Sequence, residues 1–231
     1  MTEPGGLPDR LFITGTDTGI GKTVITAALA ASARDAVGLK PLASGVPEGP
    51  AGSATPGTDA ALLALASGGP AESYRAWALP VSPHRAAMES GVGASLAETV
   101  AWIQARARAR TYVEGVGGWR VPVMPDWGIP ELAGALGWPV LVVAGNRLGV
   151  LNHTLLTVDA VRAAGLAVAG VVLNDVVGSM SPDDNGPARR RNLDDLRLLL
   201  DCPVAAFPGL PTLSRAALAA AGAALREGSL R

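Results

Sequence analysis

The sequence predicts an α/β fold in three layers, with helices on both faces of a mainly parallel central sheet. Continuous apolar runs such as Pro139–Ala144 (PVLVVA) and Val168–Leu173 (VAGVVL) are typical of strands buried on both faces. These runs alternate with segments of helical periodicity, which predicts βαβ units with right-handed crossovers. No linker or repeat interrupts the alternation, so we expect residues 1–231 to form a single domain with a disordered tail at 1–9.

The first half of the chain supplies three expected strands. Arg10–Thr14 (RLFIT) is apolar, and a glycine-containing turn joins it to a helix over Gly21–Arg34 whose apolar face includes Val24 and Leu29. The run Gly45–Thr58 (GVPEGPAGSATPGT) consists of turn formers and predicts a loop. The other elements expected here are a strand over Val37–Leu42, a helix from about Asp59 to Ala66 and a strand over Tyr74–Leu79.

The second half repeats the alternation. We expect a helix over Leu96–Arg110, in which Arg106, Arg108 and Arg110 would form a solvated face. A strand over Thr111–Glu114 follows and ends in a glycine cluster. Besides the two apolar strands already named, the elements expected after it are helices over Asn152–Ala164, Ala188–Leu200 and Ser214–Arg226 and a strand over Val204–Phe207.

The composition argues against several classes of protein. A formal net charge of −1 argues against nucleic acid or an anionic membrane as a partner, since both select basic surfaces. Hydrophobic residues make up 48% of the chain, yet no run approaches the ~20 apolar residues of a membrane-spanning helix. The N-terminus lacks the pattern of a signal peptide. The single cysteine, Cys202, is expected to be a buried structural thiol. We therefore expect a cytoplasmic protein.

Polar residues gather just after the expected strands. In a parallel α/β sheet, ligands bind beyond the carboxyl ends of the strands, so this bias points to an active site at that edge. An even distribution over the loops at both edges would argue against a site. The clusters are Gly15–Thr23, Lys40–Gly45, Glu114–Gly118, Gly145–Gly149 and Asn174–Asp175.

The stretch FITGTDTGIGKT, residues 12–23, predicts a nucleotide-binding loop. A P-loop reads Gly, four residues, then Gly-Lys-Ser/Thr. Here Gly21–Thr23 fits, Thr16 takes the place of the first glycine, and Gly15 lies one residue earlier. Because the loop joins a strand to a helix, its backbone N–H groups would face the phosphates of ATP, and Lys22 would reach the β- and γ-phosphates. The alternative is a turn that only caps a helix. The expected fold is therefore P-loop NTPase-like.

Asp59 and Glu114 are the candidate carboxylates for a Mg²⁺ ion bound also by the Thr23 hydroxyl. Taken alone, Asp59 would be a helix cap and Glu114 a surface charge. Lys40 ends another expected strand, and of the 19 basic residues only Lys22 and Lys40 are lysines. Both lie in candidate site loops, where a compact ammonium suits a phosphoryl group or a developing anion.

Six short motifs occur in order along residues 10–210. They are Gly15-Thr16-Asp17-Thr18-x-x-Gly21-Lys22-Thr23, Lys40-Pro41-x-Ala43-Ser44-Gly45, Ser82-Pro83-His84, Val113-Glu114-Gly115-x-Gly117-Gly118-Trp119, Leu148-Gly149-x-Leu151-Asn152-His153 and Asn174-Asp175. In this series the chain resembles the dethiobiotin synthetase family, ATP-dependent enzymes that close the ureido ring in biotin synthesis. A P-loop alone would be weak evidence, but six motifs in series are specific.

The resemblance implies a cyclo-ligase that forms C–N bonds with ATP and Mg²⁺. Its substrate 7,8-diaminononanoate would take up CO₂ as a carbamate, which ATP would phosphorylate to a carbamic–phosphoric anhydride. The second amine would then expel phosphate and close the cyclic urea. The family also implies a homodimer with sites at the subunit interface. The partner would supply the loop Leu148–Asn152, whose helix N-terminus receives the substrate carboxylate.

The resemblance also implies roles for individual residues. Ser44 would hold the carbamate or amine, and Asn174 would read the adenine edge. The catalytic residues would be Lys22, Lys40, Thr18 and Ser44, and the metal ligands Thr23, Asp59 and Glu114. Other nucleotide contacts would come from Asp17, Gly19, Ile20, Gly21, Gly115, Gly117, Gly118, Asp175, Pro208, Gly209 and Leu210. Other substrate contacts would come from Ser82, Pro83, Gly149, Val150, Leu151 and Asn152.

Some positions depart from the family, and rival functions stay open. Gly19 replaces an acidic residue common in relatives, and near Asn192 relatives often carry a tyrosine for the substrate carboxylate. We expect positioning roles for His84 and His153, because a carbamate mechanism requires no histidine. A switch ATPase of the partition or iron-protein kind would carry lysine where this chain has Asp17. The further rival functions are a non-catalytic nucleotide-binding module and an amidotransferase-like synthetase.

Overall fold

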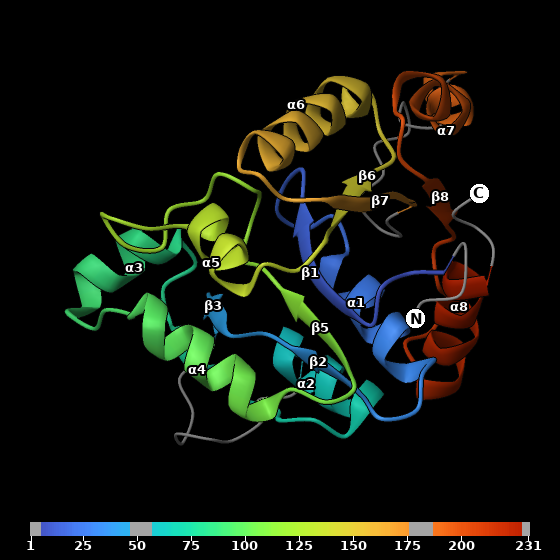
Figure 1. The fold of residues 1–231 in the computed structure, drawn as a ribbon. Helices are drawn as coiled ribbons and strands as arrows, with labels where there is room; N and C mark the ends of the chain where they lie inside the picture. The colour runs from blue at the N-terminus through green and yellow to red at the C-terminus, as the bar shows by residue number, and fades with distance from the viewer. Residues whose placement is uncertain (1–5, 47–56, 176–186, 228–231) are drawn as a thin grey trace.

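The computed structural model describes residues 6–46, 57–175 and 187–227 (Figure 1). A 6-stranded sheet has the order β2–β5–β1–β6–β7–β8. Each pair of neighbouring strands in it is parallel, which confirms the mainly parallel sheet. The strands are β1 (Arg10–Gly15), β2 (Ala36–Leu39), β5 (Arg110–Glu114), β6 (Val140–Gly145), β7 (Val168–Asn174) and β8 (Val204–Phe207).

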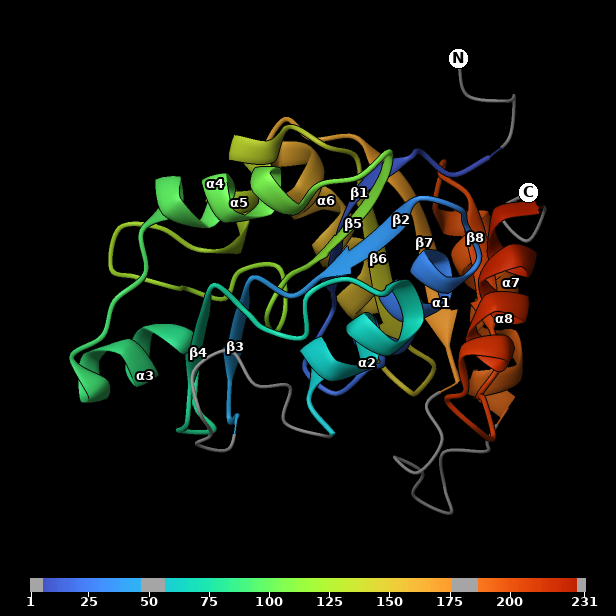
Figure 2. The same cartoon turned by 90° about the horizontal axis from the view of Figure 1, so that it is seen from below.

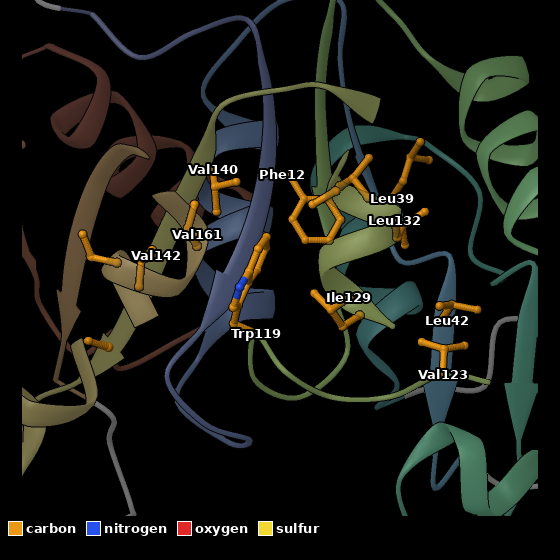
Figure 3. Close-up of a cluster of buried hydrophobic side chains, with 14 of the residues drawn as sticks. Phe12, Leu39, Leu42, Trp119, Val123, Ile129, Leu132, Val140, Val142 and Val161 are labelled. Carbon is orange, nitrogen blue, oxygen red and sulfur yellow. The ribbon is translucent and has the colours of Figure 1, made fainter. Parts of the chain in front are cut away.

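Alternate residues of each strand supply the two halves of the core, as the pleat of a strand requires. In β6, Val140 and Val142 pack in one apolar cluster, and Leu141 and Val143 pack in the other. The first cluster, part of which Figure 3 shows, lies under α4 (Leu96–Arg106), α5 (Ile129–Leu136), α6 (Val150–Ala163) and α7 (Pro187–Leu199). The second lies under α1 (Lys22–Ala31), α2 (Asp59–Ser67) and α8 (Arg215–Glu227). The expected three layers are therefore confirmed.

The strand expected over Val37–Leu42 is wrong as a single element. It is divided into β2, which ends at Leu39, and β3 (Leu42–Ser44). Pro41 lies at the break, because proline has no N–H to donate to a sheet. Beyond it, β3 pairs in parallel with β4 (Arg75–Trp77), and these two strands form a small sheet of their own (Figure 2). The expected strand over Tyr74–Leu79 is therefore confirmed in part, and Lys40 lies between the two sheets.

Two helices of the structure were not expected from the sequence. They are α3 (Pro83–Ser90) and α5, and both carry start and stop signals. Each has proline in its first two positions and a left-handed glycine at its C-terminus, Gly91 in α3 and Gly137 in α5. These signals are readable in the sequence, but both helices are short and the apolar strands are the stronger pattern. α3 packs against the small sheet of β3 and β4.

The arginine series after Trp102 does not form a solvated helix face. The helix α4 ends at Arg106, and Arg110 already begins β5. Arg108 donates to the backbone oxygens of Ala36 and Ser67, at 3.0 and 2.9 Å. These arginines therefore tie the loops at the amino edge of the sheet together.

The chain ends and the cysteine also differ from expectation. Leu7 is buried and Asp9 pairs with Arg110, so residues 6–9 pack on the domain, whereas 1–5 lie outside the described residues. Most of the loop expected over Gly45–Thr58 also lies outside them. Cys202 is only half-buried, and burial raises the pKa of its thiol, which lowers the fraction of reactive thiolate. No helix in the described part of the chain could span a membrane.

Candidate active site

The loop between β1 and α1 has the close backbone packing of a phosphate cradle. Two of its glycines have positive φ, 72° at Gly19 and 89° at Gly21, a region that other residues rarely adopt. Gly15 has ordinary backbone angles but close neighbours, because a Cβ there would lie 2.7 Å from Cδ1 of Ile20 and 3.0 Å from Cδ of Lys22. The glycine that lies one residue before the standard pattern therefore lets the side chains of Ile20 and Lys22 pack closely against the loop. α1 then begins at Lys22.

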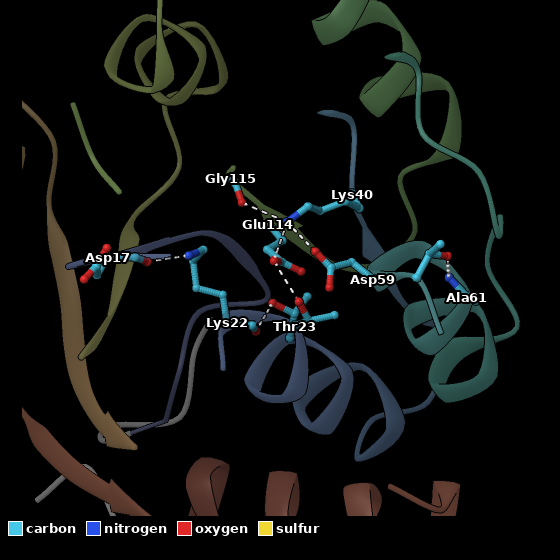
Figure 4. A network of polar contacts seen from close by, with 10 residues as sticks. Asp17, Lys22, Thr23, Lys40, Asp59, Ala61, Glu114 and Gly115 are labelled. Carbon is cyan, nitrogen blue, oxygen red and sulfur yellow. Dashed lines mark hydrogen bonds and ion pairs between the residues drawn. The ribbon is translucent and has the colours of Figure 1, made fainter. Parts of the chain in front are cut away.

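Lys22 points back over this loop and is only 5% exposed. Its Nζ donates to the backbone oxygen of Asp17 at 2.8 Å (Figure 4). Burial, and next the nearby charge of Lys40, lower the pKa of Lys22 from 10.5 to about 8. An anion bound in the loop would favour the charged form of this lysine, as a phosphate site requires.

Asp17 faces away from the loop, toward the β6–α6 connection. Its carboxylate accepts the N–H of Thr18 at 2.7 Å and a hydrogen bond from Arg147 at 2.6 Å. The hydrogen bond from Thr18, supported by Arg147, holds the pKa of this carboxyl below its usual value. Asp17 thus shapes the loop from outside.

Lys40 lies between two carboxylates at the carboxyl edge of the sheet (Figure 4). Its Nζ is 2.6 Å from Oε1 of Glu114 and 2.9 Å from Oδ2 of Asp59, and it also donates to the backbone oxygen of Gly115 at 3.2 Å. Burial alone would lower the pKa of Lys40, but Glu114 and Asp59 raise it above its usual value. The two carboxylates therefore favour the charged ammonium of Lys40 beside the P-loop.

The oxygen atoms around Thr23 fit a Mg²⁺ ion. The Thr23 hydroxyl donates to Oε1 of Glu114 at 3.0 Å and also lies near Asp59, whose pKa is lowered because Lys40 and Thr23 outweigh its burial. Oε2 of Glu114 is buried without a hydrogen-bond partner in the described structure, a costly state that a cation would relieve. Burial raises the pKa of Glu114 despite Lys40. A hydroxyl and two carboxylates are the hard oxygen ligands that Mg²⁺ prefers. The described residues hold no cluster of three or more His, Cys, Asp or Glu side chains that could bind a metal ion by themselves.

A cleft of about 1410 Å³ joins these groups to the small sheet. It brings together most of the expected reaction residues: Thr18, Gly19, Gly21, Lys22, Thr23, Lys40, Ser44, Asp59, Ser82, Pro83, Glu114 and Gly117. Its far part is lined by residues that sequence reasoning missed. They include Tyr74, which precedes β4, and Arg75 and Trp77 of β4 itself. The sequence signal for these residues was the pair of aromatic side chains, Tyr74 and Trp77, at the two ends of a short strand. The cleft is large enough for a substrate beside the nucleotide phosphates.

The expected base-binding residues lie at the ends of β7 and β8, outside this cleft. Asn174 is buried, and its Nδ2 donates to the backbone oxygen of Ile20 at 2.8 Å. Asp175 follows it, and its N–H donates to the oxygen of Phe207 at 3.1 Å. The segment Pro208–Leu210 continues directly from β8, beside the end of β7. Gly115 and Gly118 pack against the β1 side of the P-loop, where a Cβ on Gly118 would lie 3.4 Å from the oxygen of Gly15.

The segment Gly149–Asn152 forms the start of α6 and does not line the cleft of its own chain. Leu148 just before it is 83% exposed, and Leu156 about two turns later is 61% exposed. His153 lies on the same helix and His84 on α3, and neither lines the cleft. Neither histidine therefore contributes to the wall of the cleft that holds Lys40.

A family model described as an AAA domain matches residues 9–217 of this chain. Similar proteins include the ATP-dependent dethiobiotin synthetase BioD of Anaeromyxobacter dehalogenans, which is 42% identical over 219 residues, covering 90% of this chain and 94% of the relative. The protein of the same name from Ralstonia nicotianae is 43% identical, covering 79% and 84%. That from Pseudomonas aeruginosa is 38% identical, covering 93% and 94%.

Among solved structures, a nucleotide-binding protein in complex with ADP from Archaeoglobus fulgidus aligns with a TM-score of 0.42 and 15% identity. The alignment covers 98% of this chain and 90% of that chain.

Proposed function

The chain belongs to the family of ATP-dependent dethiobiotin synthetases, and on this basis we propose that it converts 7,8-diaminononanoate, CO₂ and ATP to dethiobiotin, ADP and phosphate. The observation that carries the proposal is the position of Lys40. Its buried ammonium is paired with Glu114 and Asp59 and lies in the same cleft as the P-loop lysine and Ser44. A protein that only binds ATP does not need this second buried cation.

The reaction begins with a bond between carbon and nitrogen. One amine of the substrate attacks CO₂, loses a proton and becomes a carbamate. A carbamate oxygen then forms a bond to the γ-phosphorus of ATP while the bond from that phosphorus to ADP breaks, which gives a carbamic–phosphoric anhydride. The second amine attacks the carbamoyl carbon and loses a proton, phosphate leaves, and the cyclic urea closes.

The residues of the cleft support these reaction steps by placing positive charge beside the phosphoryl group. Lys22 and Lys40 neutralise the phosphoryl oxygens as the group moves, which is the main demand of phosphoryl transfer. Ser44 and Thr18, both in the cleft, hold the carbamate and the amine beside them.

A Mg²⁺ ion would be held by the Thr23 hydroxyl and the carboxylates of Asp59 and Glu114. It would neutralise charge on the β- and γ-phosphates of ATP. The free Oε2 of Glu114 supports this assignment, because Lys40 and Thr23 already use Oε1. We assign the adenine to the region of Asn174 and Pro208–Leu210.

The substrate carboxylate is assigned to the N-terminus of α6 in a second copy of the chain. Two observations support this arrangement. The segment Gly149–Asn152 does not line its own cleft, and the apolar Leu148 and Leu156 beside it are exposed. Exposed apolar side chains at one helix end are typical of a subunit interface. The helix N-terminus supplies N–H groups for a carboxylate.

A labelled product assay tests the proposal. The protein is incubated with ATP, Mg²⁺, ¹³C-bicarbonate and the diamine, and dethiobiotin is measured by mass spectrometry together with ADP. We expect one labelled ureido carbon per product and one ADP per ring closed. ATP hydrolysis without the urea would refute the assignment and favour a switch-type ATPase.

A further inference from the structure

The loop between β6 and α6 is exposed but is held from behind by a buried amide. Arg147, Leu148 and Gly149 face solvent, whereas Asn192 of α7 is only 4% exposed. Nδ2 of Asn192 donates to Oδ1 of Asn146 at 2.8 Å and to the backbone oxygen of Arg147 at 3.4 Å. Burying an amide costs free energy unless the amide is hydrogen-bonded. The two oxygen atoms that accept from Asn192 are therefore held in place by it.

Asn146 carries this restraint on to the neighbouring strand. Its Nδ2 donates to Oδ1 of Asp175 at 2.9 Å and to the backbone oxygen of Arg189 at 3.3 Å. Its backbone N–H donates to the oxygen of Asn174 at 2.9 Å. Arg189 also donates to Oδ1 of Asp175. The end of β6, the end of β7 and the first turns of α7 thus meet at one asparagine.

The same strand end also holds the P-loop. The side chain of Asn174 donates to the backbone oxygen of Ile20, while the carboxylate of its neighbour Asp175 accepts a hydrogen bond from Asn146. On the outer side, Arg147 reaches across to the carboxylate of Asp17 at 2.6 Å. The P-loop and the β6–α6 loop are therefore fixed to each other by β7 from inside and by one ion pair from outside.

From this network we propose that Asn192 and Asn146 are positioning residues that fix the start of α6 for recognition of the substrate carboxylate. The inference rests on the proposed function of the α6 N-terminus in the neighbouring subunit's site. The amide of Asn192 sets the direction of the Arg147 carbonyl, and the helix begins three residues later at Val150. The N–H of Val150 donates to the same Arg147 oxygen at 3.2 Å, and Gly149 makes no side-chain cap, so the N–H groups of Leu151 and Asn152 stay available to a carboxylate. A misplaced helix start would weaken binding without touching the groups that react.

The test compares Asn192→Leu and Asn146→Ala with the wild type and with Leu198→Ala. Leu198 lies on α7, is 85% exposed and is the matched control. We expect KM for the diamino acid to rise by about tenfold or more in both variants, with kcat and the Kd of ATP nearly unchanged. The double variant should be no worse than the worse single one, because both act through one relay.

A substrate analogue separates positioning from general damage. The methyl ester of the diamino acid lacks the carboxylate, so the wild type should bind it more weakly. Asn192→Leu should bind acid and ester about equally. If the variant loses the same factor for both compounds, or if the Kd of ATP rises as much as KM, the positioning role is wrong.

Hydrogen exchange provides a readout that does not depend on the reaction. Asn192→Leu should speed amide exchange in residues 147–153 and leave α1 unchanged, whereas Leu198→Ala should change neither. Unchanged exchange in 147–153 would overturn the inference. Absence of dethiobiotin from the wild type would overturn the proposed function instead. The exchange measurement would still test whether Asn192 holds residues 147–153 in place.

Discussion

Nζ of Lys40 lies 2.6 Å from Oε1 of Glu114, and the two side chains are only 4% and 1% exposed. Lys40 follows β2 directly and Glu114 ends β5, and these strands are neighbours in the sheet. Parallel pairing therefore brings together two charges that are 74 residues apart in the sequence. Such a pair costs desolvation energy, and its presence in a cleft points to function rather than stability.

Replacing Lys40 by Met should separate binding from turnover. We expect kcat to fall by about 10²–10³-fold, since one charge that stabilises the transferring group is lost. The Kd of ATP, measured by calorimetry, should change little because Lys22 and the P-loop remain. The free energy of unfolding should fall by about 3 kcal/mol, because Glu114 is left buried without its partner.

Lys40→Met combined with Glu114→Gln should recover stability and not activity. Unchanged turnover in Lys40→Met would remove this residue from the site.

Binding of ATP should weaken above pH 8. The pKa of Lys22 is lowered to about 8, so the free protein loses this positive charge as pH rises through that value. ATP favours the charged form, so its binding is strongest below pH 8 and should couple to uptake of up to about one proton above it. Calorimetry in buffers of different ionisation enthalpy measures this uptake. Lys22→Arg stays charged and serves as the control. Equal proton uptake in both proteins would contradict the assignment.

Asp59→Asn should change the response to Mg²⁺. The amide keeps the size of the side chain but removes one anionic group of the proposed Mg²⁺ site, so the Mg²⁺ concentration for half-maximal turnover should rise by about tenfold or more. The helix cap at Thr58 is retained, because its own side chain accepts the N–H of Ala61. Glu89→Gln, on the exposed surface of α3, is the control. A variant with the Mg²⁺ response of the wild type would place the ion elsewhere.

Gly21 and Gly19 form a natural pair for testing the loop. Both have positive φ, but a Cβ at Gly21 would lie 2.1 Å from Nδ2 of Asn174, whereas one at Gly19 meets nothing within 4 Å. Gly19→Ala should lower the free energy of unfolding by about 1 kcal/mol through backbone strain. Gly21→Ala should lower it by about 1–3 kcal/mol more, because Asn174 must move. Urea unfolding measures both. Equal losses would show that Asn174 is not held tightly against the loop.

Much of the architecture could be predicted because strands buried on both faces are apolar without interruption. The runs around Val142 and Val172 needed no other information. The strand through Lys40 could not be divided from the sequence pattern, since Val37–Leu42 reads as one run and only the pairing of Leu42 with Arg75 shows where it leaves the main sheet. Pro41 was the available signal.

The candidate site divides in the same way. Lys22 and Thr23 follow from a local motif whose spacing fixes their geometry. Asn174 is different, because its contact with the oxygen of Ile20 spans 154 residues and depends on how β7 meets the P-loop. The hydrogen bond from Asn192 to Asn146 likewise depends on how α7 packs against the end of β6. A buried amide in a polar helix has no sequence pattern that distinguishes it from an exposed one.

The burial of both lysines has a consequence for chemical labelling. Lys22 and Lys40 are the only lysines in the chain, and each is 5% exposed. Apart from the α-amino group, acylating reagents and amine cross-linkers therefore find no solvent-exposed primary amine. Near pH 8 about half of Lys22 is neutral and nucleophilic, while Lys40 stays charged between its carboxylates. A small acylating reagent that enters the cleft should therefore modify Lys22 and not Lys40, and bound ATP, which favours the charged form of Lys22, should protect it, so that the extent of labelling reports on occupancy of the P-loop.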